Sequence, residues 1–171
     1  AAAACLALVL FSGIFSYSLY FTEAAYIDLD INPSRALTTN RFDTVIKVEA
    51  YNEDAAVLLE NLDLQYKKMD VAMDEVISAA AESEVLQRDG LVSVTVQSVS
   101  GDGAALLSDV QSTVTASVSR YAAAAVDVFP VDGDTRSAAH EHHMSPAKYL
   151  AILRLQAVDP TATIEGCRGH S

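Results

Sequence analysis

The dipeptide Asn32-Pro33 has the most specific chemistry in this sequence. An asparagine usually deamidates when the next backbone nitrogen attacks its side chain, but a proline nitrogen carries no hydrogen and cannot do so. The reverse attack stays open: the Asn32 amide nitrogen attacks its own main-chain carbonyl, forms a succinimide and expels the nitrogen of Pro33. Because this reaction is slow in an unstrained peptide, a fold would have to hold the attacking geometry. By residue chemistry alone, a turn that ends a strand is the favoured interpretation.

Acidic and hydroxyl side chains flank this bond. Asp30 and Ser34 are the candidates for assisting cleavage, and Thr38 is a further candidate in reach. Asp28 lies two positions before Asp30 on the same face of a predicted strand, which would suit acid–base work by paired carboxylates. In a chain this acidic, we expect instead that both carboxylates lie on a solvated sheet face.

Three other groups give weaker signals. The cluster His140-Glu-His-His143 lies within one predicted loop and lacks the helical His-Glu-x-x-His spacing, so we expect no specific metal site there. Gly101-Asp-Gly103 precedes a helix but has no phosphate-binding fingerprint, and turn chemistry explains it. The sequence has no Gly-x-Ser-x-Gly elbow to support a hydrolase triad. No cofactor is predicted.

Hydrophobic periodicity defines the elements that must position these residues. Alternation predicts a strand over residues 26–31, which Pro33 ends. Further strands are predicted over 36–39, 44–51, 91–99 and 125–131, and the first two of these form a hairpin through residues 40–43. Helical spacing is found over 55–62, 69–86, 107–121 and 147–158, whereas 132–143 is polar and predicted to be a loop. The pattern predicts an α+β domain with a single sheet of about five strands packed by helices.

The N-terminal end is uncharged and apolar. The first 21 of the 171 residues contain no charged side chain, and a helix of this length spans the ~30 Å hydrocarbon layer. We therefore predict a transmembrane helix over residues 1–22 and an extracytoplasmic domain over 23–171, with a single-pass location in the cell membrane. A signal peptide cleaved before Ala25 is the alternative. Since the chain has no initiator Met, we expect it to be a piece of a longer protein.

Composition excludes some partners. The net charge of −12 argues against nucleic acid, which selects basic surfaces. The two cysteines, Cys5 and Cys167, lie on different sides of the predicted membrane boundary, so neither a disulfide framework nor thiol chemistry is expected.

Several phrases in the chain resemble one known family. Tyr26-Ile-Asp-Leu-Asp-Ile-Asn-Pro-Ser34, Asn40-Arg-Phe-Asp-x-Val-Ile46, Ala50-Tyr-Asn52 and Leu-Leu-Glu-Asn-Leu62 occur in the order found in the extracytoplasmic part of RsgI-type anti-sigma factors. The likeness extends more loosely through Met144-Ser-Pro-Ala-Lys-Tyr149. It covers most of residues 1–158.

The resemblance implies a function for this segment. It implies a SEA-like domain that cleaves itself between Asn32 and Pro33, with both halves staying associated. An external signal, expected to be a polysaccharide, would then separate the halves, an intramembrane protease would act, and a sigma factor bound by a cytoplasmic domain absent here would be released. Such a chain would be a regulator and not an enzyme, since it cuts itself once. The alternatives are a non-cleaving extracytoplasmic structural or ligand-binding module, and a secreted hydrolase, for which no catalytic frame is found.

Overall fold

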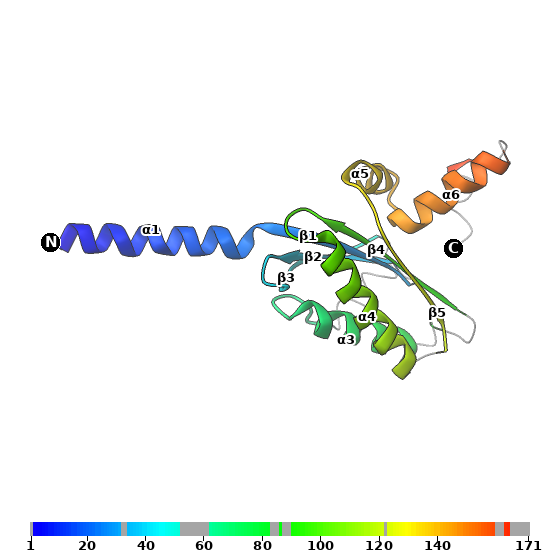
Figure 1. Ribbon diagram of the computed structural model, residues 1–171, viewed down its shortest axis with the longest axis horizontal. Helices are drawn as coiled ribbons and strands as arrows, with labels where there is room; N and C mark the ends of the chain where they lie inside the picture. Colours follow the sequence, from blue (N-terminus) through cyan, green and yellow to red (C-terminus); the bar gives the residue numbers. More distant parts are fainter. Residues whose placement is uncertain are drawn as a thin grey trace.

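The computed structural model of the chain describes residues 2–31, 34–51, 62–82, 86, 90–121, 123–159 and 163–164. Its elements alternate irregularly between strands and helices, and they form one layer of sheet with helices on both faces (Figure 1). In chain order they are α1 (Ala2–Phe21), β1 (Glu23–Asp30), β2 (Arg35–Asn40), β3 (Val45–Ala50), α3 (Met69–Glu82), β4 (Leu91–Ser98), α4 (Gly103–Tyr121), β5 (Ala125–Pro130), α5 (Gly133–Glu141) and α6 (Pro146–Val158). The predicted α+β architecture with a five-stranded sheet is present.

The first strand along the chain is the middle strand of the sheet. The strand order is β3-β2-β1-β4-β5. β1 is antiparallel to both of its neighbours, β2 and β4, and β4 is parallel to the edge strand β5. β1 is therefore hydrogen-bonded along both edges, which is the most strongly held position that a strand can take in a sheet.

One face of the sheet packs against α3 and α4 and forms the main core (Figure 1). The alternation of β1 places Ile27 and Leu29 on this face, opposite Val96 and Val94 of β4. The apolar stripe of α3 covers them, as its spacing predicted, through Met69, Ala72, Met73, Val76, Ile77 and Ala80. Three valines of α4 complete the core, namely Val110, Val114 and Val118.

The other face of the sheet is covered by α5 and α6 (Figure 1). The prediction of a loop over residues 132–143 is wrong, because α5 occupies most of that segment. Asp132 begins the helix by accepting a hydrogen bond from Thr135 N, so its polar composition reflects a capped helix on a polar sheet face. The predicted cap of α6 is confirmed: Ser145 accepts from Lys148 N, and Pro146 is the first helical residue.

Helix α1 extends away from the rest of the molecule (Figure 1). The prediction that residues 1–22 form a transmembrane helix is wrong, since no helix in the described part of the chain is long and apolar enough to cross a membrane. That prediction was based on the length and the uncharged, apolar character of residues 1–21. Residues 12–20 include three serines and two tyrosines.

The buried Asn40 joins α1 to the β2–β3 hairpin. Its side-chain Nδ2 donates to the Tyr20 carbonyl at 2.8 Å, and its Oδ1 accepts from Phe42 N and Thr44 N. Asp43 takes the left-handed conformation, with φ of 53°, which completes the predicted turn. The predicted helix over 55–62 lies almost entirely outside the described residues, and α3 is described only as far as Glu82.

Candidate functional site

The connection between β1 and β2 carries the residues that the sequence marks for cleavage. The last paired residues of this hairpin are Leu29 and Arg35, which face each other across the two strands. Asn32 and Pro33 lie outside the described residues, so their predicted role is untested. The residues on both sides are fixed by the sheet, and Ile31 is 2% exposed and belongs to the main core. In the sequence, the bond predicted to break thus lies between two strands that pair with each other.

Asp30 and Ser34 meet across this connection. The Ser34 hydroxyl donates a hydrogen bond to Asp30 Oδ1, so the two residues predicted to assist cleavage are in direct contact. The Ser34 carbonyl in turn accepts from Tyr51 N at 3.1 Å, which extends the β2–β3 pairing by one residue. Thr38, the third candidate, is four residues into β2, opposite Tyr26. It lies well along the strand from the connection and is not part of this group.

Arg35 is an unusual residue at this position. Its side chain is fully buried two residues after Pro33, and its place opposite Leu29 puts it on the core face of the sheet. In the described part of the chain, none of its three guanidinium nitrogens has a hydrogen-bond partner. Burial lowers the pKa of Arg35 to about 10. A buried cation without a partner is costly, and such features are found most often at functional sites.

The opposite face of β1 carries a second buried charge, and this one has partners. Asp28 is completely buried in the middle of the strand. Its Oδ2 accepts hydrogen bonds from Arg136 Nε of α5 at 3.2 Å and from Thr95 Oγ1 of β4 at 3.5 Å. Its Oδ1 accepts from the Tyr51 hydroxyl, which also lies 2.7 Å from His140 Nε2. We call these five residues the Asp28 network.

The network has a defined direction of proton donation. Because the single phenolic proton of Tyr51 is donated to Asp28, the proton in the Tyr51–His140 contact must come from His140 Nε2. The Arg136 guanidinium also lies 4.0 Å from the centre of the Tyr26 ring, so α5 makes two separate contacts with β1.

Burial dominates the electrostatics of the network. It raises the pKa of Asp28, and Arg136 and the Tyr51 hydroxyl oppose that rise. Burial and the neighbouring Asp28 charge both raise the pKa of Tyr51, so its hydroxyl stays protonated and donates. Burial, followed by the charge of Arg136, lowers the pKa of His140 and favours its neutral form.

This network was not predicted from the sequence. The prediction that Asp28 lies on a solvated face is wrong, because alternation shows which residues share a face but not what covers that face. The residues between Asp132 and His140 carry a pattern that could have predicted the network. Asp132 and Thr135 have the spacing of a helix cap, and Arg136 and His140, four residues apart, lie on one face of the helix that follows.

The three histidines near residue 140 do not form a common site. His140 contacts Tyr51, whereas His142 stacks on Tyr149 of α6 with ring centres 5.8 Å apart. His143 is exposed in the left-handed conformation, with φ of 54°. In the described residues, no group of three or more His, Cys, Asp or Glu side chains is placed to hold a metal ion.

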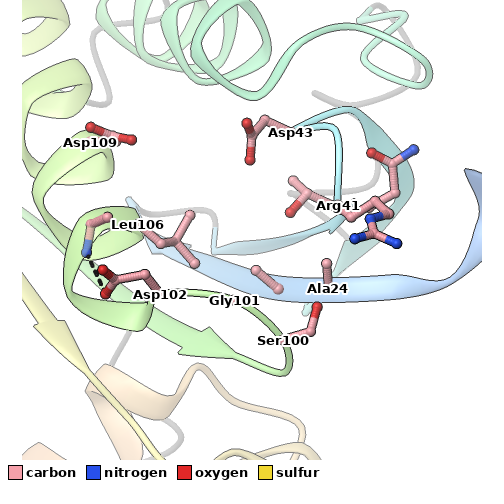
Figure 2. A pocket seen from close by; sticks show the side chains of 12 residues that line it. Ala24, Arg41, Asp43, Ser100, Gly101, Asp102, Leu106 and Asp109 are labelled. Carbon is pink, nitrogen blue, oxygen red and sulfur yellow. Dashed lines mark hydrogen bonds between the residues drawn. The ribbon is translucent and has the colours of Figure 1, made fainter.

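A pocket of about 340 Å³ lies at the opposite end of β1 from the cleavage connection (Figure 2). Asp43, Asp102 and Asp109 line it together with Arg41. The Asp102 carboxylate accepts from the backbone nitrogens of Ala104 and Ala105, which begin α4, and Gly101 has φ of +94°. The Gly101-Asp-Gly103 phrase is therefore a turn, as predicted, and Asp102 also caps α4. The pocket contains none of the residues predicted to take part in cleavage.

In this fold an N-terminal strand, β1, pairs along both of its edges at the centre of an α+β sheet. The connection that follows it contains the Asn-Pro dipeptide. A family model described as the anti-sigma factor RsgI-like central domain matches residues 24–154. The chain belongs to this family.

Three curated relatives from Acetivibrio thermocellus show the same relationship. Anti-sigma-I factor RsgI7 is 26% identical over 159 residues, covering 89% of this chain and 28% of the relative. Anti-sigma-I factor RsgI6 is 25% identical over 187 residues, covering 96% of this chain and 24% of the relative. Anti-sigma-I factor RsgI9 is 37% identical over a shorter stretch of 59 residues, or 34% of this chain and 8% of the relative. This chain thus spans about a quarter of the length of the first two.

Proposed function

We propose that this chain is the signal-relaying domain of an anti-sigma factor, and that it cleaves itself between Asn32 and Pro33. The observation that carries the proposal is the family match over residues 24–154, which includes the Asn-Pro connection between β1 and β2. On this proposal, the sigma factor is bound by a part of the protein outside this chain. The signal, expected to be a polysaccharide, acts on the relay domain and leads to release of the sigma factor.

The cleavage step needs no cofactor and no water. The side-chain amide nitrogen of Asn32 attacks the main-chain carbonyl carbon of the same residue, and a C–N bond forms that closes a succinimide ring. The bond from that carbon to the nitrogen of Pro33 breaks, and this nitrogen takes up the proton that the amide loses. Pro33 becomes a new N-terminus, and one water later opens the succinimide to a C-terminal asparagine or to its isomer with a main-chain amide and a side-chain carboxyl group.

The fold supports a cut whose products stay together. β1 pairs along both edges, with β2 and with β4, and it places Ile27, Leu29 and Ile31 in the main core. A strand cut only at its C-terminal end keeps all of these interactions, so cleavage changes the covalent chain without releasing the strand. A protease that degrades the N-terminal piece would act only after separation. The domain would be a regulator and not an enzyme, because each chain reacts once.

The cleavage is tested on the full chain, purified under denaturing conditions and refolded with protease inhibitors present. We expect denaturing gels to show two fragments, and intact mass to place the cut between Asn32 and Pro33. The two masses should sum to the mass of the intact chain while the succinimide persists, and to one water more after it opens. Asn32→Ala should stay uncut, whereas the exposed-site control Ser137→Ala should cut as the parent does.

A parent chain that stays whole after long incubation would contradict self-cleavage, and would leave the domain as a non-cleaving structural or ligand-binding module. The extracytoplasmic location and the likeness to the SEA fold stay predictions.

A further inference from the structure

The helices α5 and α6 form a small unit that is attached to the polar face of the sheet. They have an apolar cluster of their own, built on Ala139, Met144 and Ile152 with Tyr149 and Ile164 packed against it. This cluster is separate from the main core, which lies on the other face under α3 and α4. The unit is held to the sheet by α6, which lies against β4 and β1, and by the polar contacts that Arg136 makes with β1 and His140 makes with Tyr51.

We propose that α5 acts as a clasp on β1, and that displacement of α5 loosens the strand from the sheet. The clasp consists of the ion pair from Arg136 to the buried Asp28, the Arg136 contact on the Tyr26 ring, and the hydrogen bond from His140 to Tyr51. The signalling use of this clasp rests on the proposed function, whereas the clasp itself does not require that the chain be cut.

The ion pair is what makes the strand depend on the helix. Asp28 is 0% exposed and the side chain of Arg136 only 12% exposed, so their charges are screened little by water. Of the described residues, Arg136 alone forms an ion pair with Asp28. Removing one partner of a buried pair is strongly destabilising, because the remaining charge is left without compensation. The cost falls on β1, since Asp28 lies in the middle of that strand.

Tyr51 extends the clasp to the cleavage connection. Its hydroxyl lies between Asp28 and His140, and its backbone nitrogen donates to the Ser34 carbonyl. Movement of α5 would therefore affect both strands of this hairpin, at Asp28 within β1 and at Ser34 just before β2.

The order of elements makes the clasp responsive to load. α5 and α6 follow β5, the last strand in the described part of the chain, so tension applied beyond α6 reaches α6 and α5 before it reaches β5. The unit is small and its apolar cluster is separate from the main core, which are the properties of a region that opens before the rest of a domain unfolds. Opening it removes the cation from Asp28 before a single strand-to-strand hydrogen bond breaks.

The test measures how fast β1 leaves the sheet. The full chain carries Asn32→Ala to prevent self-cleavage, and a recognition sequence for a site-specific protease is inserted between residues 32 and 33. It is folded in mild detergent, which covers the exposed hydrophobic side chains of α1, immobilised through its C-terminus and then cut. The rate at which the N-terminal piece is lost is recorded for the parent, for Arg136→Met and for Arg120→Met. Arg120 is the matched control, because it pairs with Asp74 between the helices of the other face.

We expect Arg136→Met to speed release about tenfold or more, and Arg120→Met to change it less than about twofold. Because an added protease makes the cut, the result is independent of self-cleavage, and the two proposals fail separately. Equal release rates for the two arginine variants would overturn the clasp.

A second comparison tests whether Arg136→Met acts only through a general loss of folding. Asp28→Asn removes the buried charge and keeps its shape, so in that background Arg136→Met should change release less than about twofold. A tenfold effect that persists without the Asp28 charge would also overturn the proposal, because the helix would then act through other contacts.

Discussion

Two charged residues are buried at neighbouring positions of the sheet, and they differ in what surrounds them. Asp28 on β1 has Arg136, Tyr51 and Thr95 within hydrogen-bonding distance. Arg35 on β2 lies on the opposite face, against the apolar core, and its guanidinium has no partner among the described residues. The first charge contributes to the attachment of α5, and the second is a cost to the fold.

Replacing Arg35 should therefore stabilise the protein. Arg35→Met keeps much of the side-chain length and removes a buried charge, so we expect the free energy of unfolding to rise by about 1–3 kcal/mol. Urea unfolding of the full chain carrying Asn32→Ala measures this, because the chain then stays in one piece.

Arg41→Met removes the same charge from an exposed turn position and should leave stability nearly unchanged. A loss of stability in Arg35→Met would show that the guanidinium is satisfied by the rest of the chain. A gain in stability, combined with slower self-cleavage when Arg35→Met is made in the chain that keeps Asn32, would place Arg35 among the residues that prepare the Asn32 carbonyl.

At the scale of elements, α5 depends on its N-cap residue. Asp132 accepts from Thr135 N at 2.7 Å, and this hydrogen bond lowers the pKa of Asp132. Because α5 carries Arg136 and His140, a frayed N-terminus should weaken the contacts with β1. We expect Asp132→Ala to speed hydrogen exchange of α5 amides by about fivefold. It should also speed release of the cut N-terminal piece, but less than Arg136→Met does.

Asp134→Ala is the matched control for this change, since it removes the same charge from the same helical turn without removing a cap. It should leave release close to the parent rate. Equal effects of the two substitutions would mean that charge near the helix terminus, and not the cap, supports α5.

At the scale of the whole molecule, the Asp28 network makes stability depend on pH. His140 faces Asp28 of β1, Tyr51, and Glu49 and Lys47 of β3, and its own helix supplies Arg136. Burial lowers its pKa below the usual 6.5. The stability that neutral His140 contributes is fully present above that usual value, and it is lost as the pH falls through the lowered pKa of the folded state.

The parent chain should therefore lose more stability than His140→Gln between about pH 7 and about pH 5. Asp28 acts in the opposite direction at lower pH: its pKa is raised by burial, so protonation favours the folded state. The Asp28 contribution is present in both the parent chain and His140→Gln. The difference between their free energies of unfolding therefore reports the contribution of His140. Urea unfolding across this range measures it, and identical pH profiles would contradict the assignment.

Much of the fold could be predicted because its signals are local. The alternation of Ile27, Leu29 and Ile31 specified β1, and the stripe from Met69 to Ala80 specified α3, since both patterns report one face of one element. The transmembrane helix was wrong, since no helix in the described part of the chain is long and apolar enough to cross a membrane. The loop over 132–143 was wrong because its helix is short and polar, with Ala139 as its only fully buried residue in the described chain.

The sequence by itself determined the chemistry of Asn32-Pro33 and its place directly after a strand, because both are properties of adjacent residues. Tertiary structure decided that this strand is the middle one of the sheet, since that depends on pairing with β4, whose partner for Asp28 is Thr95. It also decided that Asp28 is buried and paired, because its cation arrives on a helix 108 residues further along the chain. Periodicity assigns a residue to a face, but what covers that face is settled only when distant segments pack together.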